Sequence, residues 1–205
     1  MGRLLGGIVF SLGLILVVMA GAELFTGNNL FVMAWADHKV TIGALLLNWS
    51  LVYLANFVGA VSTAGIMHLS GALGIGDGAV AETAAAIATA KLELPATQAF
   101  VRGVLCNALV CLAIWLSYAS HSVSGKILAI VFPISAFVAL GFEHSVANMY
   151  LIPIGMLNGA APDITGFIGN LVFVTLGNIV GGSILVAIIY WLIYLRPSPH
   201  QDNDT

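Results

Sequence analysis

Five long apolar runs constrain what this chain can fold into more than any other feature of its sequence. Each run reaches the roughly 20 mostly apolar residues that a helix needs to cross a bilayer. The runs cover approximately residues 4–34, 42–73, 97–119, 127–158 and 167–195. Hydrophobic residues make up 60% of the chain and charged residues 7%, with a mean hydropathy of +1.05. So little charge cannot cover a soluble domain, so we predict an integral membrane protein in contact with lipid. The 6 lysines and arginines form no basic patch, which argues against a nucleic-acid partner.

Polar stretches interrupt the first and fourth runs. The sequence GAELFTGNN occupies residues 21–29, and GFEHSVAN occupies residues 141–148. Both contain Gly-x-Glu-x-x-x-x-Asn, and the two copies lie 120 positions apart. The runs that follow them also match, because NWSLVYLANFVGA from Asn48 aligns with NLVFVTLGNIVGG from Asn170 at an offset of 122. Two consecutive matches at nearly one offset indicate an internal duplication.

The duplication predicts two repeats of opposite orientation. Three membrane crossings separate equivalent points, and an odd number of crossings inverts the second copy. Inverted repeats whose interrupted helices meet near the midplane are typical of channels and transporters. We assign residues 1–73 to repeat one and 97–195 to repeat two, within a single transmembrane channel domain over 1–195. Residues 74–96 are a polar loop that could hold a short alanine-rich surface helix, and 196–205 are a polar tail expected to be disordered.

The start of the chain allows more than one interpretation. Arg3, an apolar stretch and Ala20-Gly21-Ala22 resemble a signal peptide with its cleavage site. Cleavage after Ala22 would remove half of one repeat, which argues against that interpretation. Repeat one holds two spans and repeat two holds three, so symmetry asks for a helix before Met1. We therefore expect a fragment or a misplaced start with five of six spans present, the alternative being a real truncation.

The interrupted helices suggest a site for a small anion. A helix that begins inside the membrane presents free N–H groups and a partial positive charge. Thr26 offers a hydroxyl, and His144 offers a group that titrates near neutrality. The counterpart of His144 in repeat one is Leu24, so this position breaks the repeat symmetry. That makes His144 the stronger functional candidate.

The residues that are matched between the repeats are expected to be structural. We expect Glu23 and Glu143 to share a task such as holding loop N–H groups. Interhelical hydrogen bonds are expected for the paired asparagines Asn28/Asn148, Asn48/Asn170 and Asn56/Asn178. Cys106 and Cys111 are expected to be small core residues. The sequence has no metal-ligand, nucleotide-binding or nucleophile–base pattern, so we predict no catalytic residues, no metal and no cofactor, and a protein that is not an enzyme.

Several specific motifs occur together in this chain: ELFTGNN at 23–29, LCNALVCLAIWLSY around Asn107, and GFEHSVANM at 141–149. With FSLGLILVV and the final IYWLIYLR, they resemble the formate/nitrite transporter family, and most closely its bacterial formate channels. The similarity runs from about Gly2 to Arg196. It implies one further transmembrane helix before this region, as the repeat symmetry does.

The resemblance implies an all-α membrane fold, an aquaporin-like inverted repeat with two interrupted helices and a separate pore in each subunit of a homopentamer. Carried over residue by residue, it implies a central polar pair of Thr26 and His144. It also implies the following lining residues: a cytoplasmic-side constriction of Leu14, Leu24 and Phe25, an outward-side constriction of Phe10, Val110 and Phe137, and a polar cluster of Lys91, Asn107 and Glu143.

The resemblance also implies a multi-pass protein of the bacterial inner membrane, with the 74–96 loop in the periplasm and the C-terminus in the cytoplasm. Counting positive charges does not decide the orientation, because each side has three. The two groups are Arg3, Lys91 and Arg102 on one side, and Lys39, Lys126 and Arg196 on the other. The second group lies on short flanks, which weakly favours its side as cytoplasmic.

The function implied is passage of formate. A bare charge in an apolar constriction costs at least several kcal/mol, which transient protonation would avoid. His144 would donate the proton while Thr26 positions an oxygen; alternatively, a charged His144 would act as a counter-ion. Glu23 stands where some formate channels carry aspartate, and Gly27-Asn28 where some carry serine-threonine, so nitrite or hydrosulfide stay open as substrates. A water channel is disfavoured because paired Asn-Pro-Ala motifs are absent, and a truncated, non-conducting assembly variant is the alternative from another class.

Overall fold

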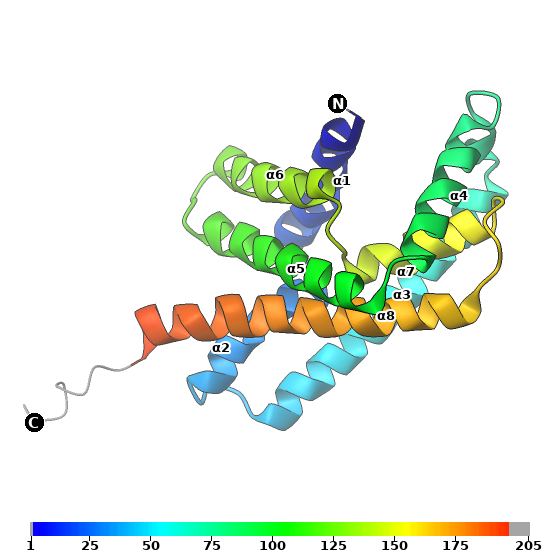
Figure 1. Ribbon diagram of the computed structural model, residues 1–205. Coiled ribbons are helices and arrows are strands. Elements are labelled where there is room, and N and C mark those ends of the chain that lie inside the picture. Colours follow the sequence, from blue (N-terminus) through cyan, green and yellow to red (C-terminus); the bar gives the residue numbers. More distant parts are fainter. Residues whose placement is uncertain (1, 197–205) are drawn as a thin grey trace, which may run out of the picture.

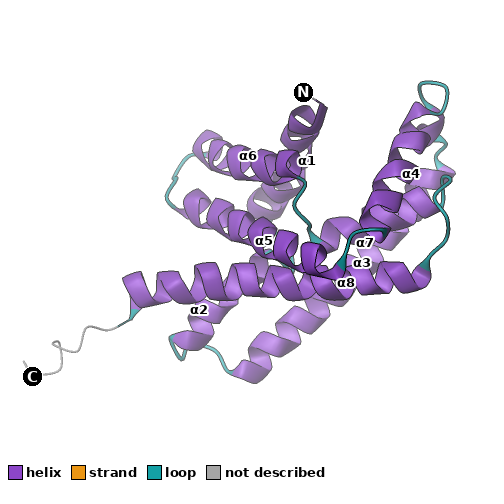
Figure 2. Ribbon diagram, in the orientation of Figure 1, coloured by secondary structure: helices purple, strands orange, loops and turns teal. Residues whose placement is uncertain are grey.

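The computed structural model describes residues 2–196, and the regular structure in that range is helical throughout (Figure 2). The α-helices in chain order are α1 Gly2–Ala20, α2 Phe31–Ala36, α3 Ile42–Leu69, α4 Ala79–Leu92, α5 Ala96–Tyr118, α6 Val123–Leu140, α7 Ser145–Met156 and α8 Ile164–Ile179. Beyond Ile179 the last helix continues as the π-helical segments η3 Val180–Ile188 and η4 Trp191–Leu195. Two short 3₁₀ segments are η1 Gly27–Leu30 and η2 Ala72–Gly74. Residues 197–205 lie outside the described range, and with them most of the tail for which we predict disorder.

The predicted number of membrane spans is confirmed within residues 2–196. Five helical segments are long and apolar enough to cross a bilayer: Gly2–Ala20, Ile42–Leu69, Ala96–Tyr118, Val123–Leu140 and Ile164–Leu195. The first apolar run divides into α1 and α2, and the fourth divides into α6 and α7. Both interruptions therefore occur where the polar stretches predict them.

Each interruption begins at a glycine. Gly21 follows α1 with φ = 73°, and Gly141 follows α6 with φ = 70°. Glycine adopts this left-handed conformation without the steric cost that a Cβ would bring, and it commonly ends helices for that reason. We call residues 21–26 the first break and residues 141–144 the second break; the chain is irregular at both before the next helical segment begins.

The polar 74–96 segment contains a helix, α4, that packs closely on α7. A Cβ on Gly155 would lie 2.3 Å from Ala88 Cβ and 2.5 Å from Ala84 O, so only glycine permits this approach. Glu82 lies in the first turn of α4 and Lys91 in the last, which suits the helix dipole. Packing of α4 on α7 fixes Lys91 beside the second break.

Close backbone contact also joins α5 to α8, which lie alongside each other in Figure 1. A Cβ on Gly177 would lie 2.2 Å from Phe100 O, and one on Gly181 would lie 2.1 Å from Val104 O. Small residues at such contacts are typical of helix pairs in membranes. Cys106 and Cys111 of α5 are both buried and free, as expected for small core residues.

Large apolar side chains cover the outside of the helices. On α3, for example, Leu47, Leu51, Leu54 and Val58 are all more than half exposed. An exposed apolar face of this length fits lipid or a neighbouring membrane helix and not water. The multi-pass membrane architecture predicted from composition is therefore what the helices form.

Candidate functional site

The two breaks are held by the same hydrogen bonds. In the first break, the Asn28 amide donates to Asn48 Oδ1 at 2.9 Å and to the Glu23 carboxylate. In the second, the Asn148 amide donates to Asn170 Oδ1 and to Glu143 Oε2, both at 2.7 Å. The matched pairs of the sequence are thus matched in space, and the predicted interhelical role of these asparagines is confirmed.

A second pair of asparagines holds the backbone of each break. Asn56 accepts the Phe25 N–H at 3.0 Å and donates to Glu23 O at 3.1 Å. Asn178 accepts the Ser145 N–H at 2.9 Å and donates to Glu143 O at 3.0 Å. Holding the loop N–H groups is therefore the task of these asparagines. Our expectation that the glutamate side chains do so is wrong, because their carboxylates accept from asparagine amides.

The second break has a cation that the first lacks. Lys91 Nζ lies 2.9 Å from both carboxylate oxygens of Glu143, and both side chains are largely buried. The Lys91 carbonyl also accepts from the Asn170 amide at 2.9 Å. Within residues 2–196, Glu23 has no salt-bridge partner. A buried carboxylate needs such a partner, whereas Glu23 is exposed to a vestibule.

Thr26 and His144 meet across the two breaks. Thr26 Oγ1 lies 2.9 Å from His144 Nε2, and both side chains are buried. His144 also caps α7, because its Nδ1 accepts the Ala147 N–H at 3.1 Å. A nitrogen that accepts carries no hydrogen, so the neutral ring has its proton on Nε2 and donates it to Thr26. The Thr26 hydroxyl hydrogen is then available to another acceptor.

Asn107 of α5 joins the backbone of the first break to that of α8. Its amide nitrogen lies 3.1 Å from Thr26 O and 2.7 Å from Asn178 O, with a third contact to Asn29 Oδ1 at 3.0 Å. The side chain is fully buried. Asn107 thus contacts the backbone of Thr26 and does not line the cavities described next.

Three cavities follow one another past the breaks. The central one, of about 190 Å³, is walled mainly by apolar side chains and reaches His144. A vestibule of about 470 Å³ on the α4 side shares Phe10, Phe137 and His144 with it. A vestibule of about 470 Å³ on the α2 side shares Val17 and Leu24 with it. Because neighbouring cavities share wall residues, they lie in series through the chain, and we call this series the path. Polar side chains line both of its ends, and mainly apolar ones line its middle.

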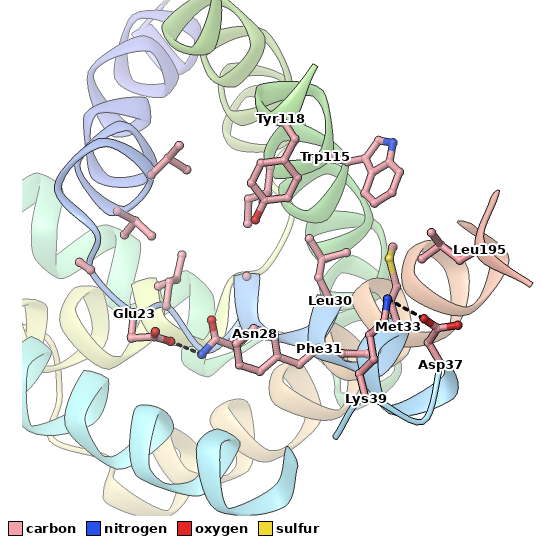
Figure 3. A pocket seen from close by; sticks show the side chains of 17 residues that line it. Glu23, Asn28, Leu30, Phe31, Met33, Asp37, Lys39, Trp115, Tyr118 and Leu195 are labelled. Carbon is pink, nitrogen blue, oxygen red and sulfur yellow. Dashed lines mark hydrogen bonds and ion pairs between the residues drawn. The ribbon is translucent and has the colours of Figure 1, made fainter. Parts of the chain in front are cut away.

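The α2-side vestibule lies between the first break and α5. Figure 3 shows Glu23 and Asn28 on one side of it and Tyr118 on another. At its edge, Asp37 forms a 2.8 Å salt bridge with Lys39 and accepts from Trp191 Nε1 at 3.3 Å. These hydrogen bonds, that from Lys39 first, lower the pKa of Asp37 below its ordinary value of 3.8.

The structure brings most of the predicted lining residues together. Those that wall the central cavity are Phe10, Leu14, Leu24, Val110, Phe137 and His144. Lys91 and Glu143 line the α4-side vestibule. Phe25 lies elsewhere: its buried ring packs edge-on against Tyr53 and Trp49 of α3, with centroid distances of 4.9 and 6.0 Å.

Other residues that line the cavities were not predicted from the sequence. Val17 and Ile134 wall the central cavity, and Arg3 and Arg102 line the α4-side vestibule. The two arginines lie on different helices. The sequence analysis placed them on the same side of the membrane but gave no indication that they lie close together.

A path bounded by the membrane helices of one chain defines a channel or transporter. Residues 1–192 match the sequence profile described as formate/nitrite transporter. The formate channel FocA of Escherichia coli K12 is 42% identical over 220 residues, which cover 98% of this chain and 77% of that protein. A probable formate transporter of Methanothermobacter thermautotrophicus is 45% identical, covering 95% and 76%. A solved structure titled "Pentameric formate channel with formate bound" superposes with a TM-score of 0.86 at 39% identity, covering 95% of this chain and 84% of that one.

The chain belongs to the formate/nitrite transporter family. The resemblance found in the sequence motifs is confirmed.

Proposed function

We propose that this protein conducts formate through a pore within each protomer. The observation that carries the proposal is the Thr26–His144 pair. His144 walls the apolar central cavity of a path with polar ends, and the fully buried Thr26 hydroxyl lies 2.9 Å from its Nε2. The names of the similar proteins, which include formate channels and a formate transporter, support formate as the substrate. The family's role in transport and the absence of a cofactor pattern in the sequence support a protein that is not an enzyme.

The central cavity is where the anion meets its main barrier. An unpaired charge in such surroundings costs several kcal/mol, so the few polar groups there decide passage. The Thr26 hydroxyl accepts from His144 and can donate its own hydrogen to a formate oxygen. We propose that Leu14 and Leu24 form the constriction toward the α2 side, and that Phe10, Val110 and Phe137 form the one toward the α4 side. For Phe25 we infer a different role, because its packing on α3 anchors the loop that carries Thr26.

Two routes past the barrier share one requirement. In one, a cationic His144 gives its Nε2 proton to formate, and the neutral acid crosses; in the other, the cationic ring acts as a counter-ion. Either route needs a second proton on the ring, at Nδ1, where the Ala147 N–H now donates. Protonation must therefore displace that hydrogen bond and loosen the first turn of α7. We propose that passage is coupled to this local rearrangement.

Formate uptake into proteoliposomes tests the histidine. We expect His144→Phe, which keeps an aromatic ring but removes both nitrogens, to lower uptake by about 100-fold. His121→Phe, at an exposed position, is the matched control and should leave uptake unchanged. Thr26→Val should also lower uptake, whereas Thr26→Ser keeps the hydroxyl and should retain most of it. Unchanged uptake with unchanged pH dependence in His144→Phe would contradict the proposal.

Nitrite and hydrosulfide are the competing substrates. Parallel uptake of labelled formate, nitrite and hydrosulfide by the same proteoliposomes ranks them directly. A faster uptake of nitrite or hydrosulfide would make that anion, and not formate, the proposed substrate. An assembled protein that passes none of the three would favour the non-conducting alternative.

Assembly and location are inferred with the function. We infer a homopentamer, supported by the similar pentameric channel, and a single channel domain over residues 1–195, because both repeats line the same path. We also infer a place in the bacterial inner membrane with the C-terminus cytoplasmic and the α4-side vestibule periplasmic. Native mass spectrometry measures the subunit number. Labelling of Asp77→Cys in intact cells by an impermeant maleimide tests the orientation, with Lys39→Cys as the opposite-side control; both native cysteines are buried.

A further inference from the structure

We propose that Arg3 and Arg102 form an anion-capture site in the α4-side vestibule, before the central cavity. The proposal rests on the proposed function, since the captured anion is the one that then passes His144. The guanidinium groups of Arg3 and Arg102 belong to neither the Thr26–His144 pair nor the Lys91–Glu143 pair, and the proposal gives them a role.

The charges of this vestibule do not balance. Arg3, Lys91 and Arg102 line it together with a single carboxylate, that of Glu143. Lys91 is engaged by that carboxylate at 2.9 Å through both oxygens. Among residues 2–196, no carboxylate lies within salt-bridge distance of either arginine. Two positive charges are therefore left for an anion from solution.

Both arginines flank the second break. Arg3 Nη1 lies 3.7 Å from the position that a Cβ on Gly141 would occupy. The Arg102 carbonyl accepts the Glu143 N–H at 3.3 Å, and its guanidinium is oriented by Gln98 Oε1, which lies 3.2 Å from Nη2. Arg3 is exposed and Arg102 half-buried, so both remain open to the vestibule. A guanidinium is the cation best shaped to hold a carboxylate, because its paired N–H groups match the two oxygens.

The opposite vestibule has no equivalent. Glu23, Asp37 and Lys39 line it, and Lys39 is paired with Asp37 at 2.8 Å. Among the described residues, no unpaired cation lines that vestibule. The positive field thus belongs to one end of the path, where it raises the local concentration of anions.

Uptake kinetics in proteoliposomes test the site. Arg3→Gln with Arg102→Gln should raise the half-saturating formate concentration about tenfold, with the rate at saturating formate unchanged. The difference should shrink in about 1 M of an impermeant salt, where the Debye length falls to about 3 Å. Arg102→Lys keeps the positive charge, so it should raise the half-saturating concentration less than Arg102→Gln does. Lys126→Gln should leave the half-saturating concentration unchanged, because Lys126 lines none of the three cavities. An unchanged half-saturating concentration in the double variant would overturn the proposal.

Chemical labelling tests binding independently of conduction. Phenylglyoxal modification of Arg3 and Arg102, followed by mass spectrometry of the intact channel, should be slowed by formate and not by neutral formamide. Equal rates with and without formate would overturn the capture site even if formate flux is normal. Loss of wild-type flux with protection preserved would instead overturn the proposed function and leave the site standing.

Discussion

The first and second breaks share a hydrogen-bond framework and differ in the groups that can do chemistry. Each has a glycine turn, a glutamate, and three asparagines that make matching hydrogen bonds within the break. Only the second has a histidine in place of Leu24 and a lysine on its glutamate. The comparison teaches that the duplicated part of the sequence builds the support and that function resides in the departures from symmetry.

The origin of the difference at the glutamates is α4. This helix lies between the two repeats in the chain and packs on α7, so its Lys91 reaches the second break alone. Glu143 is correspondingly buried at 5% exposure, while Glu23 is exposed. Burial of the Glu143 carboxylate without a cation would be costly. The pairing with Lys91 therefore allows the second break to be buried away from water.

The largest expected effect on this comparison comes from Lys91→Met. The variant leaves the buried Glu143 carboxylate without its cation, which should destabilise the protein by about 3–5 kcal/mol. The melting temperature of the purified protein in detergent measures the loss. The matched change at the first break, Glu23→Gln, keeps an acceptor for Asn28 at an exposed site and should cost less than about 1 kcal/mol. Adding Glu143→Gln to Lys91→Met should recover part of the loss; equal melting temperatures for Lys91→Met and Glu23→Gln would contradict the asymmetry.

A smaller difference is expected between Asn178→Leu and Asn56→Leu. Asn178 is fully buried and bonds to the Ser145 N–H, Glu143 O and Gly103 O, so its loss should cost about 2–4 kcal/mol. Asn56 bonds to the Phe25 N–H and Glu23 O at a half-buried position, and its loss should cost about 1–2 kcal/mol. Thermal melts of the two variants, run side by side, check the order. A larger loss for Asn56→Leu would mean that the first break is the more tightly held.

The smallest effect is expected at Asp37, at the edge of the α2-side vestibule. Its pKa is lowered in the folded protein, so its contribution to stability is present above its unfolded pKa and is lost as pH falls through the folded value. Asp37→Asn should therefore lower the melting temperature slightly at pH 7, and the difference from wild type should shrink as the pH falls below the ordinary aspartate pKa of 3.8. A difference that grows as the pH falls would contradict the sign of this pKa shift.

Much of the support could be predicted from sequence. The apolar runs give the spans, since only helices with internally satisfied backbone can cross lipid. The spacing of Gly21, Glu23 and Asn28, repeated from Gly141, gives both breaks and the matched asparagine bonds. The motif around His144 gives the family, and with it the Thr26 partner.

Other features depend on where the helices pack. The expectation that the glutamates hold loop N–H groups fails because Asn56 and Asn178 come closer to them from α3 and α8. Phe25 turns toward Tyr53 and Trp49, although its neighbour Leu24 faces the central cavity. The spacing of residues along the chain predicts neither the partners of the loop N–H groups nor the orientation of Phe25. Both depend on which side of an irregular loop is covered by another helix.

The sequence by itself thus determined the membrane class and the inverted repeat, because hydrophobic periodicity and repeated motifs are local properties of the chain. The pairing of Thr26 with His144 came only from the resemblance to the family. The tertiary structure alone decided that His144 Nδ1 accepts the Ala147 N–H and that Lys91 pairs with Glu143. It also decided that Arg3 and Arg102 both line the α4-side vestibule. Each of these facts joins residues on different helices or fixes a side-chain orientation. Hydrogen bonds and fields depend on distances of a few ångströms, which only the packed helices set.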